Sequence, residues 1–193
     1  MGLHDITAHD APLSGVQLLG IDSRPGVAEE SILDRYIRGN DLVARYAQTE
    51  QRPVSPEVYW RAFTEANISG IDLIVSMQTD RLESDPSISI GNLLPAGQFV
   101  KGAVGEAGAL FRPEHSDVSL LLAAHPSDCE LLQTDAAPEG KSTISFVLFR
   151  PGLEKGVIRR GRLRAAFLPR ANDQTLAGEQ YHEFLTSQLP LTT

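Results

Sequence analysis

The segment from residue 144 to residue 168 constrains the fold of this chain more than any other part of the sequence. It reads ISFVLFRPGLEKGVIRRGRLRAAFL, with apolar residues at every second position near both ends. Such alternation is typical of a β-strand with one buried face, because successive side chains point to opposite sides of a strand. We therefore expect two strands joined by a tight connection, as a hairpin. The apolar residues that would face inward are Ile144, Phe146 and Leu148 on the first strand and Val157, Leu163, Ala165 and Phe167 on the second.

The second of these strands carries the most concentrated basic surface of the chain. Arg160, Arg162 and Arg164 are spaced by two residues, so their side chains leave the strand on one side, opposite the apolar set. Each guanidinium is a planar fork of donors that suits carboxylate or phosphate groups. We name these three arginines as candidate ligand-binding residues. The alternative interpretation is a solvated outer face, neutralised by acidic residues of the neighbouring strands.

Residues 31–48 allow either a helix or a hairpin, since apolar residues fall on one face in both interpretations. Gly39 and Asn40 lie in the middle of this segment. Together they would cost a helix interior about 1–2 kcal/mol relative to alanine, whereas they suit the bend of a hairpin. We predict a hairpin. Residues 71–79 (IDLIVSMQT) give the clearest half-buried strand of the chain.

Residues 172–187 have the one convincing helical periodicity. Asn172 or Asp173 can cap the N-terminus by accepting from free backbone N–H groups, and Pro190 ends the helix. The apolar stripe of this helix consists of Leu176, Ala177, Tyr181, Phe184 and Leu185. We expect this stripe to pack against the rest of the protein.

Short strands separated by glycine- and proline-rich turns and followed by a helix predict a mainly β fold. We expect a single large β-sandwich of many short antiparallel strands with a C-terminal α-helix. The whole chain, residues 1–193, would form this one domain, which suits its length and its 41% hydrophobic content. Residues 1–14 would be a loose N-terminal lead-in.

Charge and cysteine usage limit the classes of partner. The net charge is −8, which argues against binding nucleic acid or an anionic membrane surface. Cys129 is the single cysteine, so no disulfide can form within the chain, and a reducing compartment is favoured. The sequence has no signal-peptide pattern and no apolar run long enough to span a bilayer. We expect a soluble, cytoplasmic protein without membrane association.

Tyr59 and Trp60 are the second group of candidate ligand-binding residues. They lie in the strand-like stretch 58–63 (VYWRAF) and therefore point to opposite sides of a sheet, so that one ring faces outward. An exposed aromatic ring on a β-sandwich can stack on the apolar face of a sugar. Trp60 suits the core, as large aromatic side chains are usually buried.

Catalytic signatures are missing from the sequence, which contains no P-loop, GxSxG, HExxH or CxxC motif. His125 precedes Cys129 by 4 residues and could act as its base if a turn brings them together. His115 and Asp117, with Asp80, could offer ligands to a divalent cation. Neither spacing selects a reaction or a metal. We therefore predict no catalytic residue, no metal ligand and no cofactor, and favour a protein that is not an enzyme.

These observations leave three hypotheses about function. The first is a non-catalytic, soluble β-sandwich that binds a carbohydrate, an anionic ligand or a protein partner through the arginine row and the aromatic pair. The second is an enzyme that acts on a carbohydrate or a small polar substrate, with Arg162 joining the histidines and aspartates named above. The third is a structural or assembly subunit, including a homo-oligomer, for which an exposed apolar patch is the expected sign.

Overall fold

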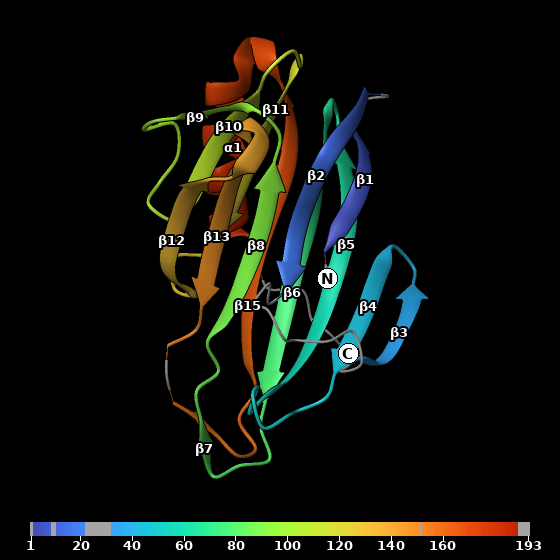
Figure 1. Ribbon diagram of the computed structural model, residues 1–193, viewed down its shortest axis with the longest axis vertical. Helices are drawn as coiled ribbons and strands as arrows, with labels where there is room; N and C mark the ends of the chain where they lie inside the picture. The colour runs from blue at the N-terminus through green and yellow to red at the C-terminus, as the bar shows by residue number, and fades with distance from the viewer. Residues whose placement is uncertain (1, 9–10, 22–31, 151, 189–193) are drawn as a thin grey trace.

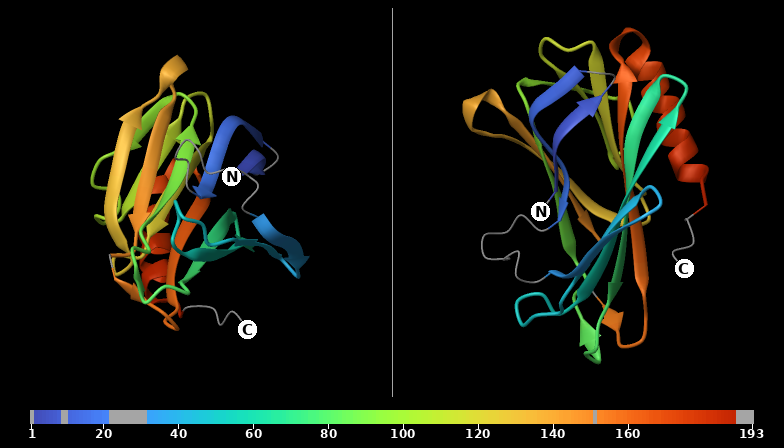
Figure 2. Two further views of the ribbon diagram at one scale, coloured as in Figure 1. Left: turned by 60° about the horizontal axis from the view of Figure 1, so that its bottom comes forward. Right: turned by 90° about the vertical axis from the view of Figure 1, so that its right-hand side faces the viewer.

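The computed structural model describes residues 2–8, 11–21, 32–150 and 152–188. Two antiparallel β-sheets face one another, and one α-helix lies against the outside of the larger sheet (Figure 1 and Figure 2). This arrangement confirms the predicted mainly β sandwich of antiparallel strands with a C-terminal helix.

Within the described residues, the smaller sheet has five strands and the larger sheet has eight. The order in the smaller sheet is β1 (Leu3–Ala8), β2 (Ala11–Ile21), β8 (Ile88–Leu94), β13 (Ser142–Leu148) and β12 (Cys129–Ala136). The order in the larger sheet is β3 (Ile32–Arg38), β4 (Asp41–Tyr46), β5 (Ser55–Glu65), β6 (Ile68–Gln78), β15 (Arg159–Pro169), β11 (Val118–Ala124), β10 (Gly108–Pro113) and β9 (Gly97–Val100). A short further pair joins β7 (Glu83–Ser84) and β14 (Leu153–Glu154).

The core between the sheets is filled by alternate residues of both sheets. Leu19 shows how the packing accommodates an interruption in strand pairing, because the register of β2 against β8 shifts there and its φ is 52°. Its N–H donates to Asn92 Oδ1 at 2.8 Å, and its carbonyl accepts from Trp60 Nε1 at 3.2 Å. Side chains of the two sheets thus satisfy backbone groups that could not stay unpaired in the interior.

β3 and β4 form the hairpin predicted for residues 31–48. They pair antiparallel, with Arg38 opposite Asp41 beside the turn. Gly39, within the turn, has a φ of 59°, a left-handed conformation that glycine adopts without steric cost. The residue that argued against a helix is therefore also the residue that the turn requires.

The expected loose lead-in over residues 1–14 is wrong. β1 and the first part of β2 occupy the described portion of this stretch and pair antiparallel at one edge of the five-stranded sheet. Leu3 and Ile6 pack against the core. An edge strand covered on one side needs only a few apolar residues, so its sequence looks more polar than that of a central strand.

The predicted hairpin over residues 144–168 is also wrong, although both strands exist. β13 belongs to the five-stranded sheet and β15 to the eight-stranded sheet, so the chain crosses between the sheets from one strand to the other. Val157 precedes β15 in a turn and is 45% exposed, not buried. Alternation identifies a strand and its buried face, but it does not say which sheet the strand joins.

α1 (Asp173–Thr186) matches the helix predicted for residues 172–187 and lies on the outer face of the eight-stranded sheet (Figure 2). Ala177 and Phe184 are buried in a second apolar cluster with residues of β6, β10, β11 and β15, and the rest of the predicted stripe packs around them. No helix in the described ranges is both long enough and apolar enough to span a bilayer.

Asp173 fixes the first turn of α1 to the sheet. Its carboxylate accepts from Arg112 Nε and Nη2 at 2.8 Å each and from Ser119 Oγ at 2.6 Å. Asn172, expected as an alternative cap, makes no side-chain cap hydrogen bond. The helix is thus anchored by a buried ion pair to β10.

Candidate ligand-binding face of the eight-stranded sheet

The arginine row lies on the outer face of the eight-stranded sheet, the side away from the core. Leu163, Ala165 and Phe167 point into the core between the sheets, so the arginines that alternate with them point outward. This is the register expected from the sequence. The arginines are less solvated than the solvated-face interpretation expected, because α1 covers part of this face. Arg162 and Arg164 are only 7% and 6% exposed.

Arg164 is fully engaged beneath α1. Its Nε and Nη2 donate to the two oxygens of Asp72 at 2.8 and 3.0 Å, and its Nη1 donates to Gln180 Oε1 at 3.2 Å. The guanidinium also lies 4.5 Å from the ring centroid of Phe63 and 5.5 Å from that of Phe184. These contacts hold the helix to β15 and β6, so Arg164 serves packing and offers no free donor fork.

Four charged side chains extend this pairing across the sheet, and we call them the charge ladder: Asp41, Arg61, Asp72 and Arg164. Arg61 Nε and Nη2 donate to Asp41 at 2.7 Å each, and Arg61 stands opposite Asp72 in the strand register. The hydrogen bonds from Arg61 lower the pKa of Asp41 despite its burial. Signs alternate strand by strand, which neutralises the arginines in the way the solvated-face interpretation proposed.

Arg162 occupies the next row and has a different environment. Its Nη1 donates to Ser187 Oγ at 2.8 Å, and its guanidinium lies 5.0 Å from the ring centroid of Phe184. The ion pairs found among the described residues do not include Arg162. Burial lowers the pKa of this guanidinium, and the fields of Asp128 and Asp72 partly oppose that effect.

Arg160 lies in a third row that is not covered in the same way. Glu57 and Arg160 both stand opposite Ser76 in the strand register, so the three side chains form a line across β5, β6 and β15. They border a recess of about 210 Å³, which we call the outer hollow. Its lining residues are Ser55, Glu57, Tyr59, Ser76, Met77, Gln78, Ile158 and Arg160.

Two buried polar atoms of the outer hollow are unsatisfied. Ser76 Oγ and Arg160 Nε are both shielded from solvent, and neither has a hydrogen-bond partner within the described part of the chain. Arg160 also takes no part in the ion pairs found within the described part of the chain. Buried polar atoms are nearly always paired in folded proteins. A hydroxyl and a guanidinium thus remain available in one small recess.

Tyr59 also lines the outer hollow, but its ring is not exposed. Its hydroxyl donates to Glu57, and burial, together with this hydrogen bond, raises the pKa of Tyr59 to about 12. The ring is only 5% exposed, because Val43 and Ile74 pack beside it and the Arg38 guanidinium lies 5.6 Å from its centroid. The expected outward aromatic face is therefore covered.

Trp60 lies on the opposite side of β5, in the core, and is 4% exposed. The structure thus brings Tyr59 and Arg160 to one recess and separates them from Trp60, Arg162 and Arg164. Glu57 and Ser76 complete that recess and were missed as site residues. Ser76 falls in the strand expected over residues 71–79, whereas Glu57 lies just before the expected strand 58–63 and belongs to β5 in the structure. Only the pairing of β5, β6 and β15 brings both residues beside Arg160.

The other candidate residues do not assemble into a recognisable active site. His125 Nδ1 lies 2.7 Å from Ser127 Oγ, and that hydroxyl donates to Asp128 Oδ1 at 2.8 Å, all within one exposed turn. Cys129 follows this turn, and its backbone N–H donates to the His125 carbonyl at 3.0 Å. Across the described ranges, no three His, Cys, Asp or Glu side chains gather closely enough to hold a metal ion.

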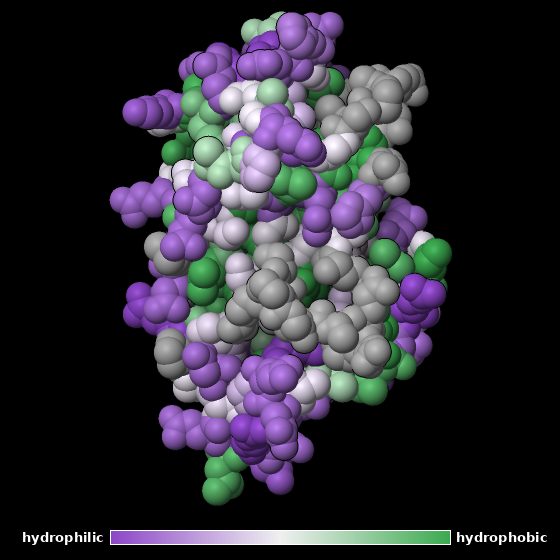
Figure 3. All heavy atoms as spheres, in the orientation of Figure 1, coloured by the Kyte–Doolittle hydropathy of each residue, from purple (hydrophilic) through white to green (hydrophobic). Residues whose placement is uncertain are grey.

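An exposed apolar patch lies on the β3–β4 hairpin, at the edge of the eight-stranded sheet. Leu33, Ile37 and Leu42 are 66%, 78% and 40% exposed. In Figure 3, apolar surface gathers over this hairpin, beside charged side chains. An exposed apolar patch is the sign expected for the third hypothesis, a structural or assembly subunit.

No protein family model and no curated protein sequence matches this chain. Several solved structures align with this chain, including the following two. A putative kojibiose phosphorylase from the human microbiome aligns with a TM-score of 0.48 and 9% identity, over 77% of this chain and 21% of that one. The heparinase III BT4657 gene product aligns with a TM-score of 0.40 and 11% identity, over 82% of this chain and 24% of that one. The chain thus spans less than a quarter of either protein.

The fold and the outer face define the class of this protein only as an antiparallel β-sandwich with a helix packed on its larger sheet. Within that class, the particular feature of this chain is a polar recess beside the helix-covered arginines.

Proposed function

We propose that this protein is a non-catalytic binding protein whose ligand presents an anionic group to the outer hollow. One observation carries the proposal: Ser76 Oγ and Arg160 Nε are buried there without a hydrogen-bond partner among the described residues. Leaving a buried polar group unsatisfied costs about 1–3 kcal/mol. A ligand oxygen placed between these atoms would remove that cost on binding.

The residues of the hollow narrow the ligand chemistry further. Arg160 can donate two parallel hydrogen bonds to a carboxylate, sulfate or phosphate group, and such charge-assisted bonds are about twice as strong as neutral ones. Glu57, across the same row, repels negative charge and accepts hydrogen bonds. The complementary ligand therefore carries a small anionic group at one end and a hydroxyl or amino donor at the other, as a sugar acid does.

The proposal includes no catalytic step. Among the described residues, Glu57 is the only carboxylate that lines the hollow, and it already accepts from Tyr59. Glycoside hydrolysis usually requires a pair of carboxylates that flank the scissile bond. The described lining supplies recognition groups and one carboxylate, not that pair.

A calorimetric titration with glucuronate, sulfate and neutral glucose tests the proposal. Glucuronate should bind, and Arg160→Gln should weaken it by about tenfold or more, as loss of a charge-assisted hydrogen bond predicts. Arg81→Gln, an exposed arginine outside the hollow, is the control for net charge and should leave binding unchanged. Equal binding to the Arg160→Gln variant and the native protein would remove the basis of the proposal.

Ser76→Ala provides a second test because it separates binding from folding. Removing a buried hydroxyl without a partner should leave the unliganded protein as stable as before, or more stable by up to about 1 kcal/mol. The same change should weaken glucuronate. A large destabilisation would show that Ser76 Oγ is satisfied in the folded protein and that the hollow is not poised for a ligand.

A further inference from the structure

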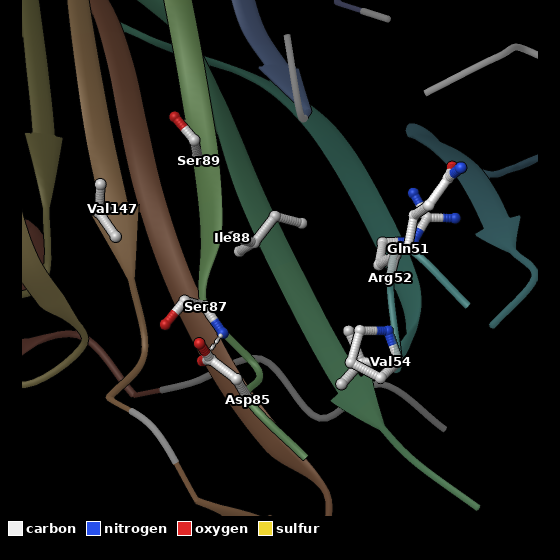
Figure 4. A pocket seen from close by; sticks show the side chains of 9 residues that line it. Gln51, Arg52, Val54, Asp85, Ser87, Ile88, Ser89 and Val147 are labelled. Atoms are coloured by element: carbon white, nitrogen blue, oxygen red, sulfur yellow. Dashed lines mark hydrogen bonds between the residues drawn. The ribbon is translucent and has the colours of Figure 1, made fainter. Parts of the chain in front are cut away.

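A second, larger cavity opens at the end of the sandwich where β5 and β8 begin, and we call it the end cavity. Its volume is about 400 Å³, within the range of small-molecule sites, about 300–1,000 Å³. Three segments line it: residues 51–54 before β5, residues 85–89 at the start of β8, and one residue of β13 (Figure 4). The lining residues are Gln51, Arg52, Pro53, Val54, Asp85, Ser87, Ile88, Ser89 and Val147.

The walls of the end cavity are tied to one another by buried hydrogen bonds. Thr79 Oγ1 donates to the Pro53 carbonyl at 2.9 Å and lies 2.9 Å from Ser84 Oγ, and both hydroxyl side chains are buried. On the other wall, Asp85 Oδ1 accepts from the Ser87 N–H at 2.9 Å (Figure 4). A site held in this way loses little conformational freedom when it binds a ligand.

Arg52 is part of the same rigid framework. Its Nη2 donates to the Ala47 carbonyl at 2.9 Å, and its guanidinium lies 5.3 Å from the ring centroid of Tyr46. The backbone N–H of Arg52 donates to Thr49 Oγ1 at 3.0 Å. The segment that forms one wall is therefore a compact turn fixed by its own side chains.

The chemistry of the cavity combines an apolar surface with hydrogen-bonding groups around it. Pro53 and Val147 are half-buried and present aliphatic surface beside the buried core residues Val54 and Ile88, and Ile88 lies between the two walls in Figure 4. Asp85, Ser87, Ser89 and Gln51 supply a carboxylate, two hydroxyls and an amide. Asp85 uses one oxygen for its turn, and a carboxylate can accept several further hydrogen bonds.

We infer that the end cavity binds a neutral, polyhydroxylated aliphatic ring, that is, a mono- or disaccharide unit. Such a ring has C–H surface that matches the half-buried side chains of Pro53 and Val147, and hydroxyl groups that can donate to Asp85 and exchange hydrogen bonds with the serines. None of the nine lining residues is aromatic, so the cavity has no stacking surface for a nucleobase or another aromatic ligand. The lining carries one carboxylate, Asp85, and one guanidinium, Arg52, so it has no net charge that would select an ionic ligand over a neutral one.

The end cavity is independent of the outer hollow and differs from it in chemistry. The two sites share no lining residue among those described: residues 51–54 line the former, whereas the latter begins at Ser55. The outer hollow is built around an unpaired arginine, whereas the end cavity presents an accessible carboxylate. Either inference can therefore fail while the other stands.

Amide chemical shifts of the full chain, followed by NMR during titration with neutral sugars, test the inference. Glucose, galactose, mannose, maltose and cellobiose are the probes, each up to about 50 mM, because single sugars often bind weakly. Saturable shifts should appear at the non-proline amides of the two walls: Gln51, Arg52, Val54, Asp85, Ser87, Ile88 and Ser89. Asp85→Asn keeps the oxygen that caps the turn but removes the charge, and it should weaken the bound sugar by about tenfold.

Glu83→Gln is the matched control, because Glu83 is an exposed carboxylate on neighbouring β7 that does not line the cavity. It should leave the affinity unchanged. Ser89→Leu places a bulky side chain in the cavity and should abolish the shifts, while the spectrum itself shows whether the variant is folded. The inference is overturned by the absence of saturable shifts for all five sugars, by shifts confined to the outer hollow, or by undiminished binding to Asp85→Asn.

Discussion

Replacing Phe184 with alanine tests how firmly α1 is docked on the eight-stranded sheet. The side chain is 1% exposed and lies in the apolar cluster beneath the helix. Truncating a buried phenylalanine to alanine costs about 3–5 kcal/mol, from lost burial and from the cavity that remains. The structure adds a second contribution, because the guanidinium carbons of Arg162 and Arg164 lie 5.0 and 5.5 Å from its ring centroid.

Those two cations are themselves buried, so each interaction with the ring is worth about 0.5–2 kcal/mol. We therefore expect Phe184→Ala to lower the free energy of unfolding by about 4 kcal/mol or more. Phe184→Leu retains most of the apolar volume and loses the aromatic face, and it should cost about 1–2 kcal/mol. Leu185→Ala, a half-buried neighbour, should cost about 1 kcal/mol.

Urea denaturation followed by circular dichroism measures these differences, with the slope of the transition checked for each variant. A loss below about 1 kcal/mol for Phe184→Ala would show that the helix is loosely attached and that the cluster beneath it contributes little. Equal losses for Phe184→Leu and Phe184→Ala would instead show that the contacts to the arginines, and not the buried volume, dominate.

Three further substitutions test the anchoring and packing of α1. Asp173→Asn weakens the hydrogen bonds that the buried Asp173 carboxylate accepts from the half-buried Arg112 and should lower the free energy of unfolding by about 1–3 kcal/mol near neutral pH. The hydrogen bonds from Arg112 lower the pKa of Asp173 in the folded protein. This stabilisation is therefore complete above the ordinary aspartate pKa of about 3.9 and is lost as the pH falls through the lowered value. Urea titrations should show a smaller stability difference between the native protein and the variant at about pH 3 than at about pH 7. Gly178→Ala, in the helix, has no atom within 4 Å of the new methyl group and should raise stability by about 0.5–1 kcal/mol, seen as a higher melting temperature. Gly105→Ala should lower the melting temperature, because its methyl group would lie 2.8 Å from the Tyr181 ring; a neutral result would mean that the loop is free to move away.

The sequence predicts local structure in this chain better than it predicts spatial partners. The β3–β4 hairpin, the buried face of β15 and the limits of α1 all follow from periodicity and from residues such as Gly39, because these features depend on nearest neighbours. Arg164 and Asp72 are 92 positions apart, and nothing local to either residue announces their pairing. The membership of β13 and β15 in different sheets is hidden for the same reason.

The candidate site was predicted in part, and the missing part has a physical explanation. The outward direction of Arg160, Arg162 and Arg164 follows from alternation. The cover over two of them comes from α1, which follows β15 closely in the chain and folds back over its outer face, and periodicity does not say on which face of the sheet a helix packs. Tyr59 is correctly outward-facing, and only the folded sheet places Arg38 over its ring. The end cavity combines segments that are distant in sequence, and no motif marks its polar residues.

The charge ladder has a consequence for how this sequence can change over time. Each inner member of the ladder, Arg61 or Asp72, has an oppositely charged neighbour on both sides. Reversing the charge of either residue would therefore create two like-charge contacts on a sheet face that α1 partly covers. A compensating reversal next to it repairs only one of those contacts. The four residues of the charge ladder are thus coupled in evolution. A single charge reversal among them is expected to be selected against, and a tolerated change requires several of them to be replaced together.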